Sequence, residues 1–557
     1  MRAFADRSQS PLFAFWERLV SMIEKGLEPI ESRIVSLQGD GMSTSLRIVV
    51  GEIMVAGFLL AAFVGDSMAG RSLVLVGVVA GLSVVAVRDR REAVVWLIAW
   101  LLVLGTTRRV VSLVQLDPLR DPLLAAAPAI AVLLAIRAVA TGGMRRLTPL
   151  AGLTALTMGV VAVAALNPRQ PSAGSAVAGV VLWGGPLLYF WIGRELDDAH
   201  AVKIARVVAG VGVVAAGYGI WQYFVGLPPW DLAWLELRDR GTDNAYASLY
   251  VGPDTIRPFG MSTSASGFAV LMGLTVTGAV AAAVRSQKTL HTRPAAAWTV
   301  VAGLAGTALV LNGTRTVMIV VIPAMIVVVS AVKGWSLLKP VLAVVVIGLF
   351  AGLAMNQIDP LSLDRDGVEG NLRRIVIAFG HPTDDQYYEN TTDQHLRLLS
   401  DGVERGFTDP LGRGPGSVGL AGDRFGGPGL NFETDIANAA VAFGVIGFFV
   451  FTAGVIAGPW TAWRARALPA RGPTDPAPLI CILILGFTIV SLRFTFNGQH
   501  WAMSALLWLG LGWADRRALL ARGRAVKLPR SATGGRRPAA GLESAAMAPP
   551  SGSHYAR

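Results

Sequence analysis

Charged residues are scarce in this chain of 557 residues, because Asp, Glu, Lys and Arg together make up only 15% of it. Hydrophobic residues make up 53%, and the mean hydropathy is +0.53. A soluble protein of this length needs far more charged surface. The composition therefore excludes a soluble globular protein and indicates a polytopic membrane protein.

Cysteine is almost absent as well. The single residue, Cys481, stands in an apolar run, which excludes a disulfide framework and a cysteine metal site. The apolar runs do not alternate with polar residues, which argues against a transmembrane β-barrel. The first forty residues carry several charges, among them Arg2, Asp6 and Glu17, and no apolar core, so we expect no cleavable signal peptide.

Long apolar runs recur along the chain, and runs of roughly 17–23 residues can each cross the hydrocarbon core of a bilayer. We therefore predict an all-α polytopic membrane protein with about 12–14 transmembrane helices. The candidate runs lie near 47–65, 71–87, 92–107, 122–140, 148–165, 174–193, 203–225, 265–284, 296–312, 315–333, 337–355, 436–458, 477–494 and 500–515.

Lysine and arginine gather in alternate short connections, and such connections face the cytoplasm. The pattern predicts a multi-pass protein of the bacterial cytoplasmic (inner) membrane with both termini in the cytoplasm. The net charge of +12 is then a topology signal, and we expect membrane lipids and no nucleic acid as partners. Arg108, Arg109 and Arg120 break the pattern on the outer side, where they either reach up to the membrane interface or contact an anion.

The chain divides into six predicted segments. They are a cytoplasmic amphipathic N-terminal segment (1–45), N-terminal transmembrane helices (46–225), an outer loop and helices with Arg257 and Arg315 (226–355), a large extracytoplasmic, partly helical loop (356–435), C-terminal transmembrane helices (436–516) and a basic, disordered cytoplasmic tail (517–557).

Two arginines stand where polar sequence returns to the membrane on the outer side. Arg257 precedes a turn and a run of hydroxyl residues at the start of an apolar run, and Arg315 separates two apolar runs with almost no loop. A positive charge beside a helix N-terminus suits phosphate, and an arginine held at the membrane edge is costly unless it is paired. The alternatives are ordinary Ser and Thr capping at the first position and an interfacial arginine at the second.

The large loop holds further candidates. His395, Arg397 and Arg405 belong to a stretch in which Leu396, Leu399 and Val403 recur at helical spacing, so we expect an amphipathic helix on the membrane. Arg397 and Arg405 are two turns apart and could share a face. The glycines Gly412, Gly414 and Gly416 that follow predict a flexible turn with close backbone approach.

Two carboxylates end the large loop. Glu433 and Asp435 stand in the first turn of the next apolar helix, where they either interact with the helix dipole or act as a general base. Asp364-Arg365-Asp366 has the D-x-D pattern of some metal-dependent sugar transferases, but three residues carry little information. We expect no metal and no cofactor.

The order of these parts resembles the O-antigen ligase and Wzy-type O-antigen polymerase superfamily. The likeness covers roughly residues 200–460. Its motifs are Arg257-Pro-Phe-Gly, Gly-Thr-Arg315-Thr, a large outer loop with Arg397 and Asp409-Pro-Leu-Gly-Arg-Gly-Pro-Gly416, and Gly444-Val-Ile-Gly447.

The resemblance implies an inverting membrane glycosyltransferase that takes its glycan from a polyprenyl-diphosphate-linked donor on the outer face, without nucleotide sugar or metal. It implies that Arg257 and Arg315 hold the diphosphate, to which we add Arg397 or Arg405. The acceptor is a glycan, a lipid or a protein. We expect Glu433, or else Asp435 or His395, to take its proton. Ligases of this family show His-Asn where this chain has Glu433-Thr434, which favours a polymerase or another branch.

Two other functions fit parts of the pattern. A transporter or a flippase for lipid-linked oligosaccharide would also need many crossings and intramembrane charge, but its polar residues usually lie near the middle of the membrane. A cell-wall polymerase of the shape-and-division type would use a similar donor, and the order of arginines fits it less well.

Overall fold

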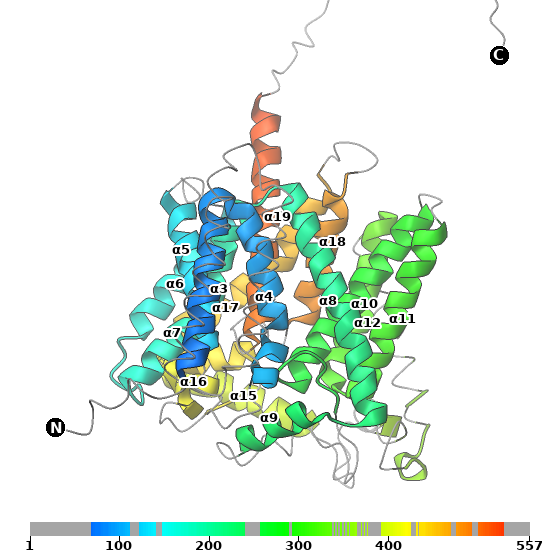
Figure 1. Ribbon diagram of the computed structural model, residues 1–557, viewed down its shortest axis with the longest axis horizontal. Coiled ribbons are helices and arrows are strands. Elements are labelled where there is room, and N and C mark those ends of the chain that lie inside the picture. The colour runs from blue at the N-terminus through cyan, green and yellow to red at the C-terminus, as the bar shows by residue number, and fades with distance from the viewer. Residues whose placement is uncertain are drawn as a thin grey trace, which may run out of the picture.

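The computed structural model describes residues 68–111, 122–140, 148–239, 257–288, 292–336, 392–424, 430–468 without Glu433, 475–492 and 500–527, and scattered positions between 339 and 376. Within these ranges the chain forms α-helices packed side by side and no strand, apart from one isolated bridge between Val418 and Leu430 (Figure 1). The predicted N-terminal segment 1–45 and most of the tail 517–557 lie outside the described residues.

Seven of the described helices are long and apolar enough to cross a membrane: α4 (Arg90–Val111), α7 (Ala173–Gly193), α8 (Asp198–Val225), α10 (Ala265–Lys288), α11 (Thr292–Asn312), α12 (Arg315–Lys333) and α17 (Asp435–Arg466). Shorter apolar segments lie in α3 (Met68–Arg88), in η3 (Pro122–Ala125) with α5 (Ala126–Ala140), in α6 (Pro149–Ala164) and in α18 (Ala477–Val490), and α19 (Trp501–Lys527) completes the bundle. The prediction of an all-α fold is confirmed for the described residues, and the seven apolar helices are consistent with a polytopic membrane protein. The number of crossings stays a prediction, because 47–65 and most of 337–355 lie outside the described residues.

The bundle has two different ends (Figure 1). One, here called the loop end, carries the short helices α9 (Pro229–Asp239), α15 (Thr392–Thr408) and α16 (Gly419–Arg424) and the 3-10 turns η4 (Pro360–Ser362) and η5 (Pro415–Ser417). The other, here called the basic end, holds the last turns of α3, α10, α12 and α17, each of which contains Arg or Lys. Gathering of basic residues at one end agrees with the sequence pattern. The side of the membrane that each end faces stays a prediction.

Acidic residues pair with the arginines at the basic end. Arg194 lies 3.3 Å from Asp515 and Arg91 lies 2.8 Å from Asp197. These ion pairs join the connection between α7 and α8 to α19 and α4. The basic end is therefore a charged network between helices as well as a topology signal.

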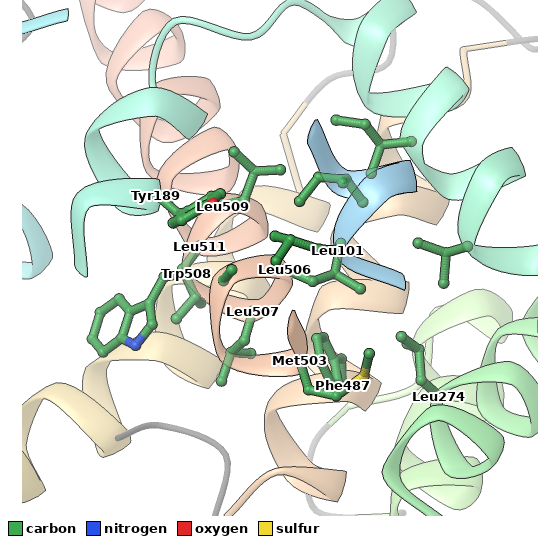
Figure 2. Close-up of a cluster of buried hydrophobic side chains, with 14 of the residues drawn as sticks. Leu101, Tyr189, Leu274, Phe487, Met503, Leu506, Leu507, Trp508, Leu509 and Leu511 are labelled. Atoms are coloured by element: carbon green, nitrogen blue, oxygen red, sulfur yellow. The ribbon is translucent and has the colours of Figure 1, made fainter. Parts of the chain in front are cut away.

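The helix α19 runs through the interior of the bundle. It contacts α4, α6, α7, α10, α17 and α18. Figure 2 shows Leu506, Leu507 and Leu509 of α19 among buried side chains of its neighbours, such as Phe487 of α18 and Leu101 of α4. Against α7 the two backbones touch, because a Cβ at Gly193 or at Gly512 would meet a carbonyl oxygen of the other helix. Small residues allow this close helix packing in membranes.

The helix α17 is broken at Gly444, whose φ of 66° and ψ of −158° are non-helical. The preceding loop fills the break: the N–H groups of Arg413 and Gly414 donate to the carbonyls of Val441 (3.0 Å) and Ala442 (2.8 Å). Backbone groups at membrane depth need such partners. The predicted close approach at Gly412, Gly414 and Gly416 is confirmed, since all three are buried against other backbone or against Gln170.

Candidate functional site

The structure brings together the two segments that carry Arg257 and Arg315. Asn312, the last residue of α11, is fully buried, and its side-chain amide donates to the carbonyl of Pro258 at 2.7 Å. Its oxygen accepts from the hydroxyl of Thr314 at 2.5 Å. One side chain therefore links the residue after Arg257 to the residue before Arg315.

Two helices begin at this junction. The amide of Asn312 also donates to the carbonyl of Ala265, the first residue of α10, at 3.1 Å, and Arg315 is the first residue of α12. Thr314 is the N-cap of α12 but makes no side-chain capping bond; its hydroxyl instead donates to Asn312. Helix N-termini carry partial positive charge. Two of them, with two half-buried arginines, form an arrangement suited to an anion.

A buried ion pair at the end of α4 supports the Arg257 segment from the other side. Arg109 lies 2.9 Å from Asp231 of α9, and neither side chain is exposed at all. Arg109 also donates to the carbonyl of Gly260 at 2.5 Å. The prediction that Arg108 and Arg109 reach up to the interface is wrong: both are buried, and the Arg108 guanidinium lies 4.9 Å from the ring centre of Trp234.

Gln222 of α8 extends this network. Its amide nitrogen donates to Asp231 at 2.6 Å, and its oxygen accepts from the N–H groups of Phe259 (3.1 Å) and Gly260 (2.7 Å). The hydroxyl of Tyr218 donates to the same carboxylate oxygen of Asp231, Oδ2, at 2.7 Å, while Arg109 donates to Oδ1. Tyr218 and Gln222 lie near Asp231 in the chain. Arg109, however, is 122 positions from Asp231, and Gln222 is 38 positions from Gly260, so no local pattern in the sequence signals the network.

The start of α17 carries Asp435, which is fully buried. Capping of this helix is done by Thr434, whose hydroxyl accepts from the N–H of Ala437 at 3.2 Å. Asp435 therefore stands buried at the positive end of a helix without being its cap. Glu433, the first choice for the general base, lies outside the described residues.

The helix α15 lies along the first half of α17, where Gly402 and Gly406 approach Ala437 and Ala440. The predicted helix is present, with Leu399 packed against the core and Leu396 59% exposed. Its position on the membrane stays a prediction.

The three site residues predicted in this part of the large loop, His395, Arg397 and Arg405, all lie on α15. Arg397 and Arg405 are both exposed. The Arg405 guanidinium lies 5.4 Å from the ring centre of Phe432, three residues before Asp435. The structure thus brings Arg405 to the start of α17. His395 belongs to α15, and its side chain lies outside what the structure describes.

The predicted residues therefore form two groups at the loop end. Arg257 lies in the segment before α10 and Arg315 is the first residue of α12, while Arg405 and Asp435 belong to α15 and α17. The helix α18 packs against α10, α12 and α17, so the two groups share a neighbour. His500, at the start of α19, packs on the first turn of α10: its Nδ1 would be 3.3 Å from a Cβ at Gly267.

Metal ligands were not expected, and the structure does not test that prediction. Asp364 of the D-x-D pattern is exposed and Asp366 lies outside the described residues. Asp89, Glu92 and His200 lie close enough together to hold a metal ion, but at the basic end, where Glu92 already pairs with Lys203.

Comparison with known proteins adds no relative: no family model matches the chain, and no curated protein matches it. The resemblance to the O-antigen ligase and polymerase superfamily therefore stays a prediction from the motifs.

Proposed function

We propose that the chain is an integral membrane glycosyltransferase that transfers or polymerises glycan from a polyprenyl-diphosphate-linked donor. In this proposal the loop end faces away from the bacterial cytoplasm, both termini lie inside, and residues 356–435 form the extracytoplasmic loop. The observation that carries the proposal is the link through Asn312, which puts the Arg257 and Arg315 segments at one junction of two helix N-termini.

The leaving group of such a reaction explains why arginines are needed. The acceptor hydroxyl attacks the anomeric carbon, the bond from that carbon to the diphosphate oxygen breaks, and its electron pair stays on the diphosphate. Arginine guanidinium groups stabilise that developing charge by charge-assisted, bidentate hydrogen bonds. Arg257 and Arg315 would hold the diphosphate, with Arg405 or Arg397 approaching from α15.

The proton of the acceptor hydroxyl needs a base. Glu433 or Asp435 at the start of α17 would receive it, with His395 of α15 as the third candidate. The contact of Arg405 with Phe432 supports this placement, because it brings an arginine to the start of α17. The helix α15 would then cover the acceptor side of the site.

A transporter or flippase remains the second candidate, and the break of α17 at Gly444 favours it. Transporters often bind anionic substrates at the N-terminus of a broken helix. Here, however, the chain itself occupies the break, because the N–H group of Val445 donates to the carbonyl of Pro410 at 3.3 Å.

A reconstitution experiment separates these functions. The purified chain in liposomes is given undecaprenyl-diphosphate-linked glycan, and free carrier and product size are followed by mass spectrometry. We expect release of undecaprenyl diphosphate with either a lengthened glycan or one glycan moved to another acceptor. Movement of labelled donor across the bilayer without carrier release would contradict the glycosyltransferase and support the transporter.

A further inference from the structure

The backbone between Phe259 and Met261 is held by side chains. Gln222 accepts from the N–H groups of Phe259 and Gly260, Arg109 donates to the carbonyl of Gly260, and the hydroxyl of Thr106 donates to the carbonyl of Met261 at 3.2 Å. These side chains belong to α4 and α8, so two helices fix the path of the segment that begins at Arg257.

This arrangement is itself held in place. Asp231 receives the Gln222 amide nitrogen at 2.6 Å and Arg109 at 2.9 Å. Gln222 is only 2% exposed. A buried amide whose nitrogen is bound by a carboxylate has one orientation, because the oxygen must then face the other way. That oxygen faces the two N–H groups that follow Arg257 by two and three residues.

The opposite side of the segment is held by Asn312, through the carbonyl of Pro258. The four residues after Arg257 are therefore fixed from α4, α8 and α11 together. Preorganised charge is worth more than mobile charge, because no ordering cost remains when the ligand binds.

We infer that Gln222, oriented by Asp231 and Arg109, is a positioning residue that fixes Arg257 for binding the diphosphate of a lipid carrier. This inference rests on the proposed function. Gln222 acts through the backbone of Phe259 and Gly260 and does not touch the carrier.

The test compares Gln222→Met, which keeps the side-chain length and removes the hydrogen bonds, with the wild-type chain. Binding of undecaprenyl diphosphate to the full chain in nanodiscs is measured by titration. We expect about tenfold weaker binding, which is the effect of losing about one hydrogen bond that orients Arg257. In an Arg257→Ala background the same change should alter binding by less than about twofold, because residues that act through one another are not additive.

Gln170→Met is the matched control. Gln170 also holds a loop, by donating to the carbonyl of Ala165 at 2.8 Å and accepting from the N–H of Gly416 at 2.8 Å, but that loop is not the Arg257 segment. We expect this control to lose thermal stability and to bind the carrier with wild-type affinity. If Gln222→Met does not fold, Thr106→Val removes one bond to the same segment and should weaken binding in the same Arg257-dependent way.

The outcomes are distinct. The positioning role would be overturned if Gln222→Met weakened carrier binding equally in the wild-type and Arg257→Ala backgrounds, or did not weaken it at all. The proposed function would still stand. Failure of the wild-type chain to bind undecaprenyl diphosphate would overturn both.

Discussion

Arg109 and Asp231 form an ion pair in which both side chains are entirely buried, with 2.9 Å between Nη1 and Oδ1. Each partner also makes other hydrogen bonds: Arg109 to Gly260, and Asp231 to Tyr218 and Gln222. Replacing both partners of a buried ion pair by apolar residues often costs little stability. Removing only one partner destabilises the fold, because it leaves an uncompensated buried charge. Through Gly260 and Gln222 the pair contacts the segment after Arg257, so we expect it to hold that segment in place.

Removal of one partner of this pair should be severe. Arg109→Met leaves Asp231 without its counter-charge, and we expect a loss of about 3–5 kcal/mol in the free energy of unfolding. The double variant Arg109→Met with Asp231→Leu should recover much of that loss, since neither charge is left. Thermal unfolding of the detergent-solubilised chain checks both. An Arg109→Met chain that melts like the wild type would refute a structural role for the pair.

Gly444 should tolerate no side chain. Its φ of 66° and ψ of −158° suit glycine only, and a Cβ would press on the carbonyl of Pro410. We expect Gly444→Ala to cost about 3 kcal/mol or more, from backbone strain and overpacking together. Gly454→Ala in the same helix is the control. No atom lies within 4 Å of its Cβ position, and we expect a change of at most about 1 kcal/mol. Equal melting temperatures for the two variants would show that the break in α17 does not depend on Gly444.

Asn312 should matter for both folding and binding. Asn312→Ala leaves the carbonyls of Pro258 and Ala265 without this donor, and we expect a loss of about 1–3 kcal/mol of stability. Because the side chain joins the Arg257 and Arg315 segments, binding of undecaprenyl diphosphate should weaken as well. A chain that loses stability but binds the carrier as tightly as wild type would show that the link is structural only.

Low pH should weaken the contribution that Asp197, at the basic end, makes to the stability of the folded state. Burial raises the pKa of this carboxyl, but hydrogen bonds from His200 and the charge of Arg91 outweigh it and lower the pKa from 3.8 to about 2. A carboxyl whose pKa is lowered by folding stabilises the folded state fully above its unfolded pKa, and that stabilisation disappears as the pH falls through the folded value. The difference in melting temperature between wild type and Asp197→Asn should be constant above about pH 4 and shrink towards pH 2. A difference that does not change over this range would contradict the pKa shift.

Much of the helical architecture could be predicted from apolar runs alone. The run 315–333 coincides with α12, and the run 203–225 lies within α8, because length and hydropathy decide which segments suit a membrane. The start of α12 at Arg315 followed from the same reasoning, since the polar residues before it leave no room for a loop.

Tertiary partners could not be predicted in this way. Arg109 and Asp231 are 122 positions apart, and locally an arginine at the end of an apolar run favours the interface. The break at Gly444 depends on hydrogen bonds from Arg413 and Gly414, and the bond from Asn312 to Pro258 joins the end of α11 to the segment before α10. Each is a property of the packed bundle, which a single sequence does not display.

The central claim is that Arg257 and Arg315 act together on a lipid diphosphate. The most direct measurement is the initial rate of undecaprenyl diphosphate release from donor by wild type, Arg257→Ala and Arg315→Ala in liposomes, at equal amounts of folded protein. Arg169→Ala is the control, because this exposed arginine pairs with Asp409 at the surface. We expect both site variants to fall by at least about a hundredfold, as when an oxyanion donor is lost, while the control keeps its rate. Full activity of Arg257→Ala and Arg315→Ala would contradict the account.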